Sequence, residues 1–363
     1  MNTQDKMNLT NEEFERRIDI LRGQSFYIGN SYFPKFPSKS NQERFEDCVN
    51  QIKKYGWPDF NYLLYGMDVK TEEENDKYVN AMEFVYRRNY LNFERNPINS
   101  CVLLRNKYYF GIFAKAIGIK TPNNIAYIEH GYIYNIHDSF KKISFKEMMK
   151  ISSDVFCKSN EGENGVAVYH LQQIDGNYYC NGIVIEEEDF SRKLGNETFI
   201  VQEKILQHPE MDRLYPTSIN TIRLDTVRSL KTGDIYIWPS IMRMGTGGSH
   251  IDNGSQGGIM VNINLETGYL SEDGYIEPQF NGRIVHEHPD TGVVFSTFKI
   301  PYFKDACKQA IYFHSKLKDI HSIGWDVVIT SEGPAFIEGN DDWEILDAQL
   351  GGGVRNLFER DFF

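Results

Sequence analysis

Short runs of alternating apolar and polar residues follow one another from Ile125 onward, with glycine-containing turns between them. An alternation of period two predicts β-strands that bury one face and leave the other polar. The runs that show it are NIAYIEHGYIYN, DVFCK, GVAVYHLQQI, NYYCNGIVI, FIVQEKIL, NTIRLDTVRS, IYIWPSIMRM and GGIMVNIN. We therefore expect the last two thirds of the chain to be rich in strands.

Helical spacing of apolar residues, combined with plausible N-caps, predicts several helices. The expected helices run from Asn11 to Leu21 (with Thr10 or Asn11 as the N-cap), from Asn41 to Tyr55, from Glu72 to Tyr90, from Asn106 to Ala116, from Ser144 to Ser152 and from Tyr302 to Ile320. The last of them carries an apolar stripe, Ala306, Ala310, Phe313 and Leu317, which we expect to face a sheet. The pattern as a whole predicts an α+β fold with a helical front.

Composition narrows the class of protein. The chain has 363 residues, 40% hydrophobic and 25% charged, which suits a globular protein of two domains or three small ones. Its formal charge of −12 is opposite in sign to that of proteins that wrap a nucleic-acid backbone, so we expect no nucleic-acid partner. Five scattered cysteines without a CxxC pair argue against a disulfide framework and a structural zinc site.

The chain shows no segment typical of a membrane or secreted protein. It has no run of 18 apolar residues, so we expect no membrane span. The polar start MNTQDKMNLTNEEFERR has no apolar core of the secretory-signal type. We therefore expect a cytoplasmic protein.

The segment IGWDVVITSEGPAFIEGNDDWE, residues 323–344, is typical of a β-hairpin. We expect strands from Ile323 to Ile329 and from Pro334 to Glu338, joined by a turn that ends in Gly333. If Thr330 faces Pro334, then Asp326 faces Glu338, and Asn340 projects from the same face. Phe336 is expected on that polar face too.

Two carboxylates that face each other across a hairpin repel one another unless a cation lies between them. Oxygen ligands of this kind suit Mg²⁺, or Mn²⁺, with bound phosphates completing the coordination shell. The sequence thus predicts a metal site at Asp326, Glu338 and Asn340. The alternative is a surface hairpin with a few solvated acids.

Lys158 ends a predicted strand and is followed by a loop that contains Gly162 and Gly165. Backbone N–H groups in a glycine hairpin can close over phosphate oxygens, and a lysine at a strand end supplies a positive charge. The alternative is an ordinary exposed loop, because short motifs of this kind are common.

In their order and spacing, these features resemble the ATP-grasp superfamily over roughly residues 100–345. The segments SINTIRLDTV, DNGSQGGI, HEHPDTG and IGWDVVITSEGPAFIEGN are similar to its sugar-transfer-associated branch. The resemblance implies two α+β lobes that clasp ATP, behind a helical N-terminal accessory region at residues 1–100. It implies a first lobe with the glycine loop at residues 101–205 and a second lobe with the metal site at residues 206–363.

The resemblance also implies roles for single residues. Lys107 and Lys158 match lysines that reach the phosphates of ATP, beside the loop of Gly162 and Gly165. The string EKILQHPE is similar to one in D-alanine–D-alanine ligases, which implies that the strand Glu203, Lys204, Ile205 and Leu206 reads adenine through its backbone. Glu210 is then the candidate for the ribose hydroxyls, with Asp212 as its rival.

Arg223 and Arg243 resemble arginines of glutamate-adding ligases that face the transferred phosphate. Asn253, followed by Gly257 and Gly258, resembles the N-x3-GG segment of those enzymes. A guanidinium holds two phosphate or carboxylate oxygens at once and stays charged, which suits this role. The alternative for either arginine is a surface salt bridge.

Three histidines, His250, His286 and His288, could each act as a general base near neutral pH. A structural role is the favoured interpretation for each of them. His288, in the string HPDTG, is expected to stabilise a turn or to position substrate.

The implied activity is that of an ATP-dependent carboxylate–amine ligase which works through an acyl phosphate, with ATP and Mg²⁺ (or Mn²⁺) as cofactors. The expected substrates are a small-molecule acid, such as a sugar-derived one in polysaccharide or related biosynthesis, and an amine. Two alternatives stay open: a kinase with a hydroxyl acceptor, and a non-catalytic ATP-binding partner of a glycosyltransferase system. A homodimer or an association with sugar-transfer enzymes is a further expectation.

Overall fold

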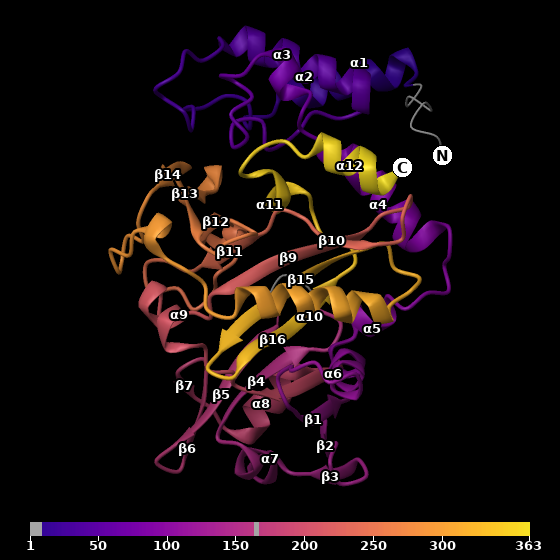
Figure 1. The fold of residues 1–363 in the computed structure, drawn as a ribbon. Helices are drawn as coiled ribbons and strands as arrows, with labels where there is room; N and C mark the ends of the chain where they lie inside the picture. Colours follow the sequence, from indigo (N-terminus) through magenta and orange to yellow (C-terminus); the bar gives the residue numbers. More distant parts are fainter. Residues whose placement is uncertain (1–8, 163–166) are drawn as a thin grey trace.

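The computed structural model describes residues 9–162 and 167–363 (Figure 1). Within these ranges the chain forms two antiparallel sheets and a separate group of N-terminal helices, so the predicted α+β fold class is confirmed. Figure 1 shows the helices of residues 11–75 at the top, the second sheet in the middle and the first sheet at the bottom. No helix in the described part of the chain is long and apolar enough to cross a membrane.

The N-terminal region holds several helices, three of which begin at a capping box. Thr10, Ser40 and Thr71 each accept a hydrogen bond from the backbone N–H three residues on. The glutamate at that position accepts a hydrogen bond in return from the backbone N–H of the capping residue. The helices are α1 Asn11–Arg22, α2 Asn41–Tyr55, α3 Glu72–Asn75, α4 Ala81–Asn89, the π-helical turn η1 Tyr90–Glu94, α5 Val102–Arg105 and α6 Lys107–Ala116.

The single helix expected from Glu72 to Tyr90 is wrong. The chain leaves the helical path after Asn75 and starts again at Ala81, because Asn80 has an extended backbone and caps α4. Its side-chain oxygen accepts from the N–H groups of Met82 and Glu83. The other five predicted helices are confirmed, although the last is shorter than expected and ends at Lys316.

The first sheet has eight antiparallel strands in the order β3-β2-β1-β8-β4-β5-β6-β7. Two helices, α7 Phe145–Ile151 and α8 Glu187–Leu194, contribute Phe145, Met148 and Phe190 to its apolar core. Its strands are β1 Asn124–Glu129, β2 Tyr132–Asn135, β3 Lys141–Ile143, β4 Asp154–Ser159, β5 Val168–Ile174, β6 Asn177–Cys180, β7 Ile183–Val184 and β8 Phe199–Glu203.

The second sheet is also antiparallel, in the order β14-β13-β12-β11-β9-β15-β16, and β10 pairs with β9. The strands are β9 Thr221–Arg228, β10 Ile235–Ile237, β11 Ile241–Met244, β12 Ile259–Ile263, β13 Leu270–Ile276, β14 Arg283–Val285, β15 Ser322–Thr330 and β16 Gly333–Asn340. The remaining helices are α9 Pro209–Leu214, α10 Phe303–Lys316, α11 Leu346–Gln349 and α12 Arg355–Phe362, with 3₁₀ turns η2 Gly254–Gln256, η3 Pro278–Phe280 and η4 Phe295–Thr297.

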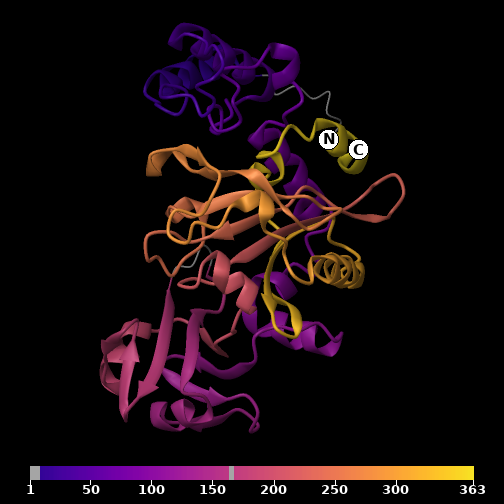
Figure 2. The same ribbon diagram turned by 60° about the vertical axis from the view of Figure 1, so that its left-hand side comes forward.

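Opposite faces of the second sheet are covered by different layers. Helix α10 lies along one face, and its predicted stripe is buried there; Phe313 stacks on Trp325 of β15. Helix α6 packs into the same core, where Phe110 stacks on Phe313. Ile241, Met260 and Tyr275 belong to the core of the N-terminal helices, which lie beyond the sheet in both views (Figure 2). The domain limits themselves remain a prediction.

Candidate functional site

The hairpin of β15 and β16 brings Asp326 and Glu338 face to face. They are register partners, as predicted, but the predicted pairing at the turn is wrong, since Thr330 pairs with Gly333. An irregularity between Val327 and Asp326 leaves Ile337 as an extra residue on β16 and shifts the register by one. Without this β-bulge, Asp326 would face Ile337.

The bulge also explains why the expected position of Phe336 is wrong. Phe336 pairs with Val327 on the turn side of the bulge, and its ring packs against Trp325 and Phe313 in the core. It is fully buried on the face opposite Asp326. The extra residue therefore lets Phe336 point into the core while Glu338 points away from it.

Asn340 joins the two carboxylates on their face of the sheet. Its side-chain nitrogen lies 3.4 Å from Asp326 Oδ2 and 3.5 Å from Glu338 Oε1. Rotating the amide by half a turn would present its oxygen to the same space, so the three side chains can offer an all-oxygen donor set.

The residues present fit a hard divalent cation. Asp326 Oδ1 is buried and, within the described residues, has no contact with hydrogen-bond geometry, although it forms an ion pair with Arg223 Nε at 2.8 Å. Burial and the charge of Asp326 raise the pKa of Glu338. Burial would also raise the pKa of Asp326, but the guanidinium groups of Arg223 and Arg243 outweigh it and lower that pKa. A cation between the carboxylates would offset the burial and the repulsion from Asp326 that raise the pKa of Glu338.

Protein ligands alone do not complete such a site. Across residues 9–162 and 167–363, no group of three or more His, Cys, Asp and Glu side chains is placed to hold a metal ion. A cation here would rest on two carboxylates and one amide, with the rest of its shell from water or from a bound phosphate.

Arg223 and Arg243 lie on the same face as Asp326. Arg223 on β9 is the register partner of Asp326, with Nε 2.8 Å from Oδ1. Arg243 on β11 faces Thr221, and its Nη1 lies 3.6 Å from the same oxygen. Both arginine side chains are buried, with exposed fractions of 11% and 12%. The alternative of a surface salt bridge is therefore wrong for both.

Three further aspartates surround these arginines, and they were not among the predicted site residues. Asp347 Oδ2 on α11 lies 2.6 Å from Arg243 Nη2 and 4.0 Å from Arg223 Nε. Asp252 accepts hydrogen bonds from the N–H and hydroxyl groups of Thr221. Asp225 is fully buried, and burial raises its pKa well above the usual range. Asp225 could have been found, since it alternates with Arg223 on β9, but no spacing points to Asp347.

The two predicted phosphate-binding lysines approach the metal-site hairpin from the other side. Lys107 begins α6, and its Nζ donates to Gly162 O at 2.5 Å and lies 4.0 Å from Glu338 Oε2. Lys158 lies on β4; burial lowers its pKa, while the charge of Glu338 opposes that change. Glu338 thus lies within range of both lysines. Gly165, the second predicted glycine, lies outside the described residues.

The predicted adenine-reading segment connects the two sheets. Glu203 ends β8, and its N–H donates to Asn123 O. Lys204 donates its N–H to Asp154 O, and Leu206 is 74% exposed. Two residues on, the N–H of His208 donates to Ile329 O of β15 at 2.7 Å, so Ile205 and its neighbours are held between the sheets.

The two candidates for ribose binding lie on the short helix α9. Glu210 pairs with Arg213 at 2.5 Å, and Asp212 accepts a hydrogen bond from the side chain of Gln207. Both side chains are already engaged, and the choice between them remains a prediction.

Asn253 caps the 3₁₀ turn η2, where its side chain accepts from the N–H of Ser255. Gly257 follows with φ at 90°, and Gly258 donates its N–H to Asn253 O. A Cβ on Gly258 would lie 2.3 Å from the carbonyl oxygen of Asp252, so only glycine fits there. The N-x3-GG segment is thus a tight loop next to Asp252.

The histidines make structural contacts. His288 is buried, stacks on Tyr215, and has Nε2 2.9 Å from Gly245 O, while its Nδ1 accepts from the N–H of Asp290. His250 contacts the carbonyl oxygen of Thr217, and His286 pairs with Asp273. The structural interpretation of His288 as a turn residue is confirmed.

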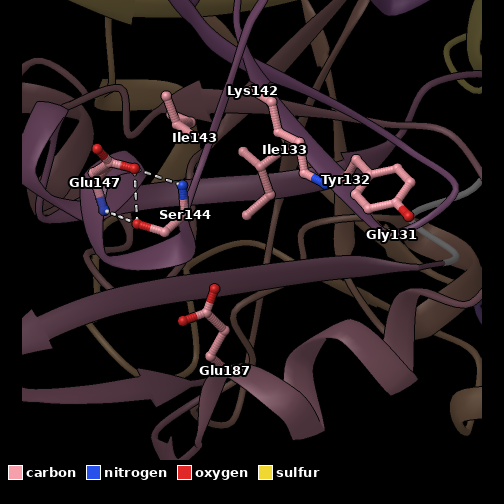
Figure 3. Close-up of a pocket in the computed structure, with 8 residues that line it drawn as sticks. All are labelled: Gly131, Tyr132, Ile133, Lys142, Ile143, Ser144, Glu147 and Glu187. Atoms are coloured by element: carbon pink, nitrogen blue, oxygen red, sulfur yellow. Dashed lines mark hydrogen bonds between the residues drawn. The ribbon is translucent and has the colours of Figure 1, made fainter.

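A cavity of about 450 Å³ lies away from these residues, in the first sheet's lobe (Figure 3). Its polar lining groups bond to the protein: Ser144 and Glu147 form the cap of α7, and Glu187 accepts from the N–H of Phe145. None of its eight lining residues is a predicted site residue.

Comparison with known sequences and structures gives one match by family. The profile described as "sugar-transfer associated ATP-grasp" matches residues 86–360. A search of curated proteins found no match.

Among solved structures, the chain is similar to the D-Ala:D-Ser ligase VanG from Enterococcus faecalis (11% identity, TM-score 0.39, covering 72% of this chain and 59% of that one). It is similar to the D-alanine–D-alanine ligase from Bacillus anthracis complexed with ATP (11%, 0.38, 70% and 61%). It is also similar to the N5-carboxyaminoimidazole ribonucleotide synthetase from Thermotoga maritima (12%, 0.34, 66% and 42%). The chain spans about half the length of the solved structures that it matches. Its activity therefore has to be argued from its own residues.

Proposed function

This chain belongs to the sugar-transfer associated ATP-grasp family, and from that membership we propose that it is an ATP-dependent carboxylate–amine ligase. Its two antiparallel sheets are the two lobes of the ATP-grasp fold. The proposal concerns the reaction, its substrates and the residues that carry it.

One observation carries the proposal: charged side chains from both sheets meet at the β15–β16 hairpin. Asp326, Glu338 and Asn340 share one face, with two buried arginines on one side and two lysines on the other. A polyphosphate needs such an arrangement, because lysine and arginine bind its oxygens while a divalent cation offsets its remaining charge.

Charge balance supports the need for a cation. Around the hairpin, the side chains of Lys107, Lys158, Arg223 and Arg243 are met by carboxylates of Asp225, Asp252, Asp326, Glu338 and Asp347. Burial raises the pKa values of Asp225, Asp252 and Glu338, but Asp326 and Asp347 pair directly with the arginines, so part of the positive charge is already matched before any phosphate binds. The triphosphate of ATP would therefore need to bring Mg²⁺, or Mn²⁺, with it.

In this proposal Asp326, Glu338 and Asn340 hold the cation, which when bound supplies charge neutralisation for the phosphates. Lys158 and Lys107, beside Gly162 and the glycine loop, orient the phosphate chain from the first lobe. The backbone from Glu203 to Leu206 binds the adenine, and Glu210 or Asp212 the ribose.

Arg223, Arg243 and Asn253 would stabilise the negative charge that develops as phosphate is transferred. A carboxylate oxygen of the acid attacks the γ-phosphorus and ADP leaves, giving an acyl phosphate. An amine then attacks the acyl carbon, loses a proton and displaces phosphate, forming an amide. The family description favours a sugar-derived acid, in polysaccharide or related biosynthesis.

The test is a mass-spectrometric screen of carboxylate and amine pairs with ATP and Mg²⁺. We expect ADP together with an amide, and an acyl hydroxamate when hydroxylamine replaces the amine. ADP with a stable phosphoester and no hydroxamate would instead identify a kinase. No turnover with any pair, but intact ATP binding, would favour the non-catalytic alternative.

The Asp326→Asn variant connects this activity to the hairpin. Removing one negative charge from the cation site should lower turnover by at least 100-fold, because one oxygen ligand becomes a weaker neutral donor. Asp68→Asn is the matched control, since Asp68 is buried too and pairs with Arg44 at 3.3 Å in the N-terminal region. Equal losses in both variants would contradict the proposal.

A further inference from the structure

Helix α11, one turn long from Leu346 to Gln349, carries two buried polar residues that bind different parts of the molecule. Asp347 pairs with Arg243 of the candidate site, and Gln349 binds the backbone of Val79 in the N-terminal region. We infer that Asp347 is a positioning residue that holds Arg243 for phosphate transfer, and that contacts with residues 77–83 hold α11 in place. This inference rests on the proposed function.

Arg243 has two carboxylate partners at unequal distances. Its Nη2 lies 2.6 Å from Asp347 Oδ2, whereas its Nη1 lies 3.6 Å from Asp326 Oδ1. Burial would lower the pKa of Arg243, but Asp347 first, and then Asp326, raise it above the usual value. Asp347 is thus the stronger partner and keeps the guanidinium charged inside the protein.

The weaker partner has another proposed role. If Asp326 directs its charge to a divalent cation, it can contribute less to holding Arg243. Arg223 is closer to Asp326, at 2.8 Å, than to Asp347, at 4.0 Å. The four charged side chains therefore form two main ion pairs, Arg223 with Asp326 and Arg243 with Asp347. Asp347 leaves Nη1 of Arg243 directed toward the cation site.

A single helical turn is not stable by itself, so the position of Asp347 depends on what surrounds α11. Gln349 is fully buried: its Oε1 accepts from the N–H of Val79 at 2.7 Å, and its Nε2 donates to Val79 O at 3.0 Å. Together these bonds satisfy both backbone groups of one residue, which would otherwise be left unpaired.

The chain just beyond α11 is fixed to the same segment. A Cβ on Gly353 would lie 2.2 Å from Lys77 O, which leaves room only for glycine. The N–H of Arg355 donates to Lys77 O at 2.9 Å, and its guanidinium pairs with Glu83 at 2.8 Å. Residues 77–83 precede the part of the chain that the family profile matches, residues 86–360. The N-terminal region therefore supports the site indirectly.

The experiment measures kcat, and KM for MgATP, in steady-state ADP release by the full chain with substrates found in the screen. We expect Asp347→Asn to lower kcat 10- to 100-fold and to change KM for MgATP less than threefold, because Arg243 is misaligned only for transfer. Asp347→Glu, which keeps the charge, should recover at least part of the loss.

Two comparisons separate positioning from a general effect on folding. Asp361→Asn is the matched control: Asp361 is buried and pairs with Arg360 at 2.6 Å, away from the arginines of the site. It should leave kcat unchanged even where it lowers the melting temperature. In an Arg243→Met background, Asp347→Asn should have no further effect on kcat, because the group that it positions is gone.

Additive losses in the double variant, or equal losses in Asp347→Asn and Asp361→Asn, would overturn the inference. Gln349→Met tests whether the contact with Val79 holds α11 in place, because it removes both hydrogen bonds to Val79. It should lower kcat as Asp347→Asn does, and have a smaller effect in the Arg243→Met background. Failure of the proposed function looks different, since the unmodified chain itself would then show no ADP release.

Discussion

Lys158 is a residue of the first sheet on which a charge of the second sheet acts. It lies on β4 of the first sheet, and the charge of Glu338 on β16 of the second acts on it. Burial lowers its pKa, so its positive charge is held at a cost in free energy that an anion would offset. The side chain is therefore better suited to a bound phosphate than to bulk solvent.

We predict that Lys158→Met weakens the binding of a non-hydrolysable ATP analogue by about 10- to 100-fold, since a hydrogen bond to a charged group contributes about 1.5–3 kcal/mol. Calorimetric titration with Mg²⁺ present measures the change. Lys39→Met is the matched control: the Lys39 side chain is 23% exposed and pairs with Asp47 at 2.7 Å in the N-terminal region. A similar loss in both variants would contradict a specific role for Lys158.

The residues of the site differ in how well the sequence predicted them. Asp326, Glu338 and Asn340 could be predicted together because hairpin pairing converts their spacing into a shared face. Asp347 could not be predicted in this way, because it reaches Arg243 from a separate helix with no sequence period in common. Side chains that meet through tertiary packing alone leave no local pattern to read.

At the scale of elements, the β-bulge at Ile337 is the feature that the sequence conceals. A regular hairpin and a bulged one have the same alternating pattern on either side, so pairing predicted from the turn alone missed it. The predicted register is off by one residue at Thr330, and the bulge shifts the true register by one residue before Asp326, so the two agree at Asp326. The predicted partners at the site are correct, whereas the predicted face of Phe336 is wrong.

The break between α3 and α4 has a similar origin. Residues 72–90 contain strong helix formers on both sides of the break, such as Glu72–Glu74 and Ala81–Glu83. Between them, Asn80 caps α4 and also donates a hydrogen bond to Trp57 O at 3.1 Å. Tertiary contacts of this kind override local propensity. They fix Val79 in the conformation that Gln349 recognises.

We predict that Asn80→Ala lowers the free energy of unfolding by about 1–2 kcal/mol, because it removes the N-cap of α4. The cap bonds come from the backbone N–H groups of Met82 and Glu83. Asn80→Ser, which can still accept these bonds, should lose less. Urea denaturation of both variants measures the difference. If the serine variant were the less stable of the two, the capping role would be contradicted.

At the scale of the whole molecule, the N-terminal helices cover an apolar face of the second sheet. Ile241, Met260, Tyr275 and Leu350 pack with side chains of α1 and α2 in one core. The hydroxyl of Tyr32 also donates to Ile276 O at 2.7 Å. Figure 1 shows this region as a distinct layer, yet its core is continuous with the sheet.

A chain that starts at residue 86, where the family profile begins, should therefore fold poorly. It would expose the four side chains that pack against the helices and leave Gln349 without Val79. We expect low solubility and strong binding of a hydrophobic dye, measured against the full chain at equal concentration. A soluble, dye-negative fragment with full activity would show that the N-terminal region is dispensable.

Two buried histidines make the second lobe sensitive to acid. Burial lowers the pKa of His314 to about 3, and that of His321 to about 3. Both are fully buried. His321 Nδ1 has no hydrogen-bond partner in the described part of the chain, so a proton there would create an unpaired buried charge. Asp59 acts in the opposite sense, because burial raises its pKa to about 6.

These shifts set the sign of the pH dependence. Histidine in the unfolded chain has a pKa near 6.5, so the histidine contribution to the free energy of unfolding is constant above that pH. Below it, the unfolded chain binds protons that the folded chain does not bind, and the free energy of unfolding falls. At pH 5 each histidine lowers the free energy of unfolding by about 2 kcal/mol relative to neutral pH. Asp59, which binds its proton more tightly in the folded state, raises it by about 1.4 kcal/mol. We therefore predict a net loss of about 3 kcal/mol between pH 7 and pH 5, measured by urea denaturation. His321→Asn should reduce this loss by about 2 kcal/mol, whatever its effect at pH 7, and an unchanged difference between the two pH values would contradict the assignment.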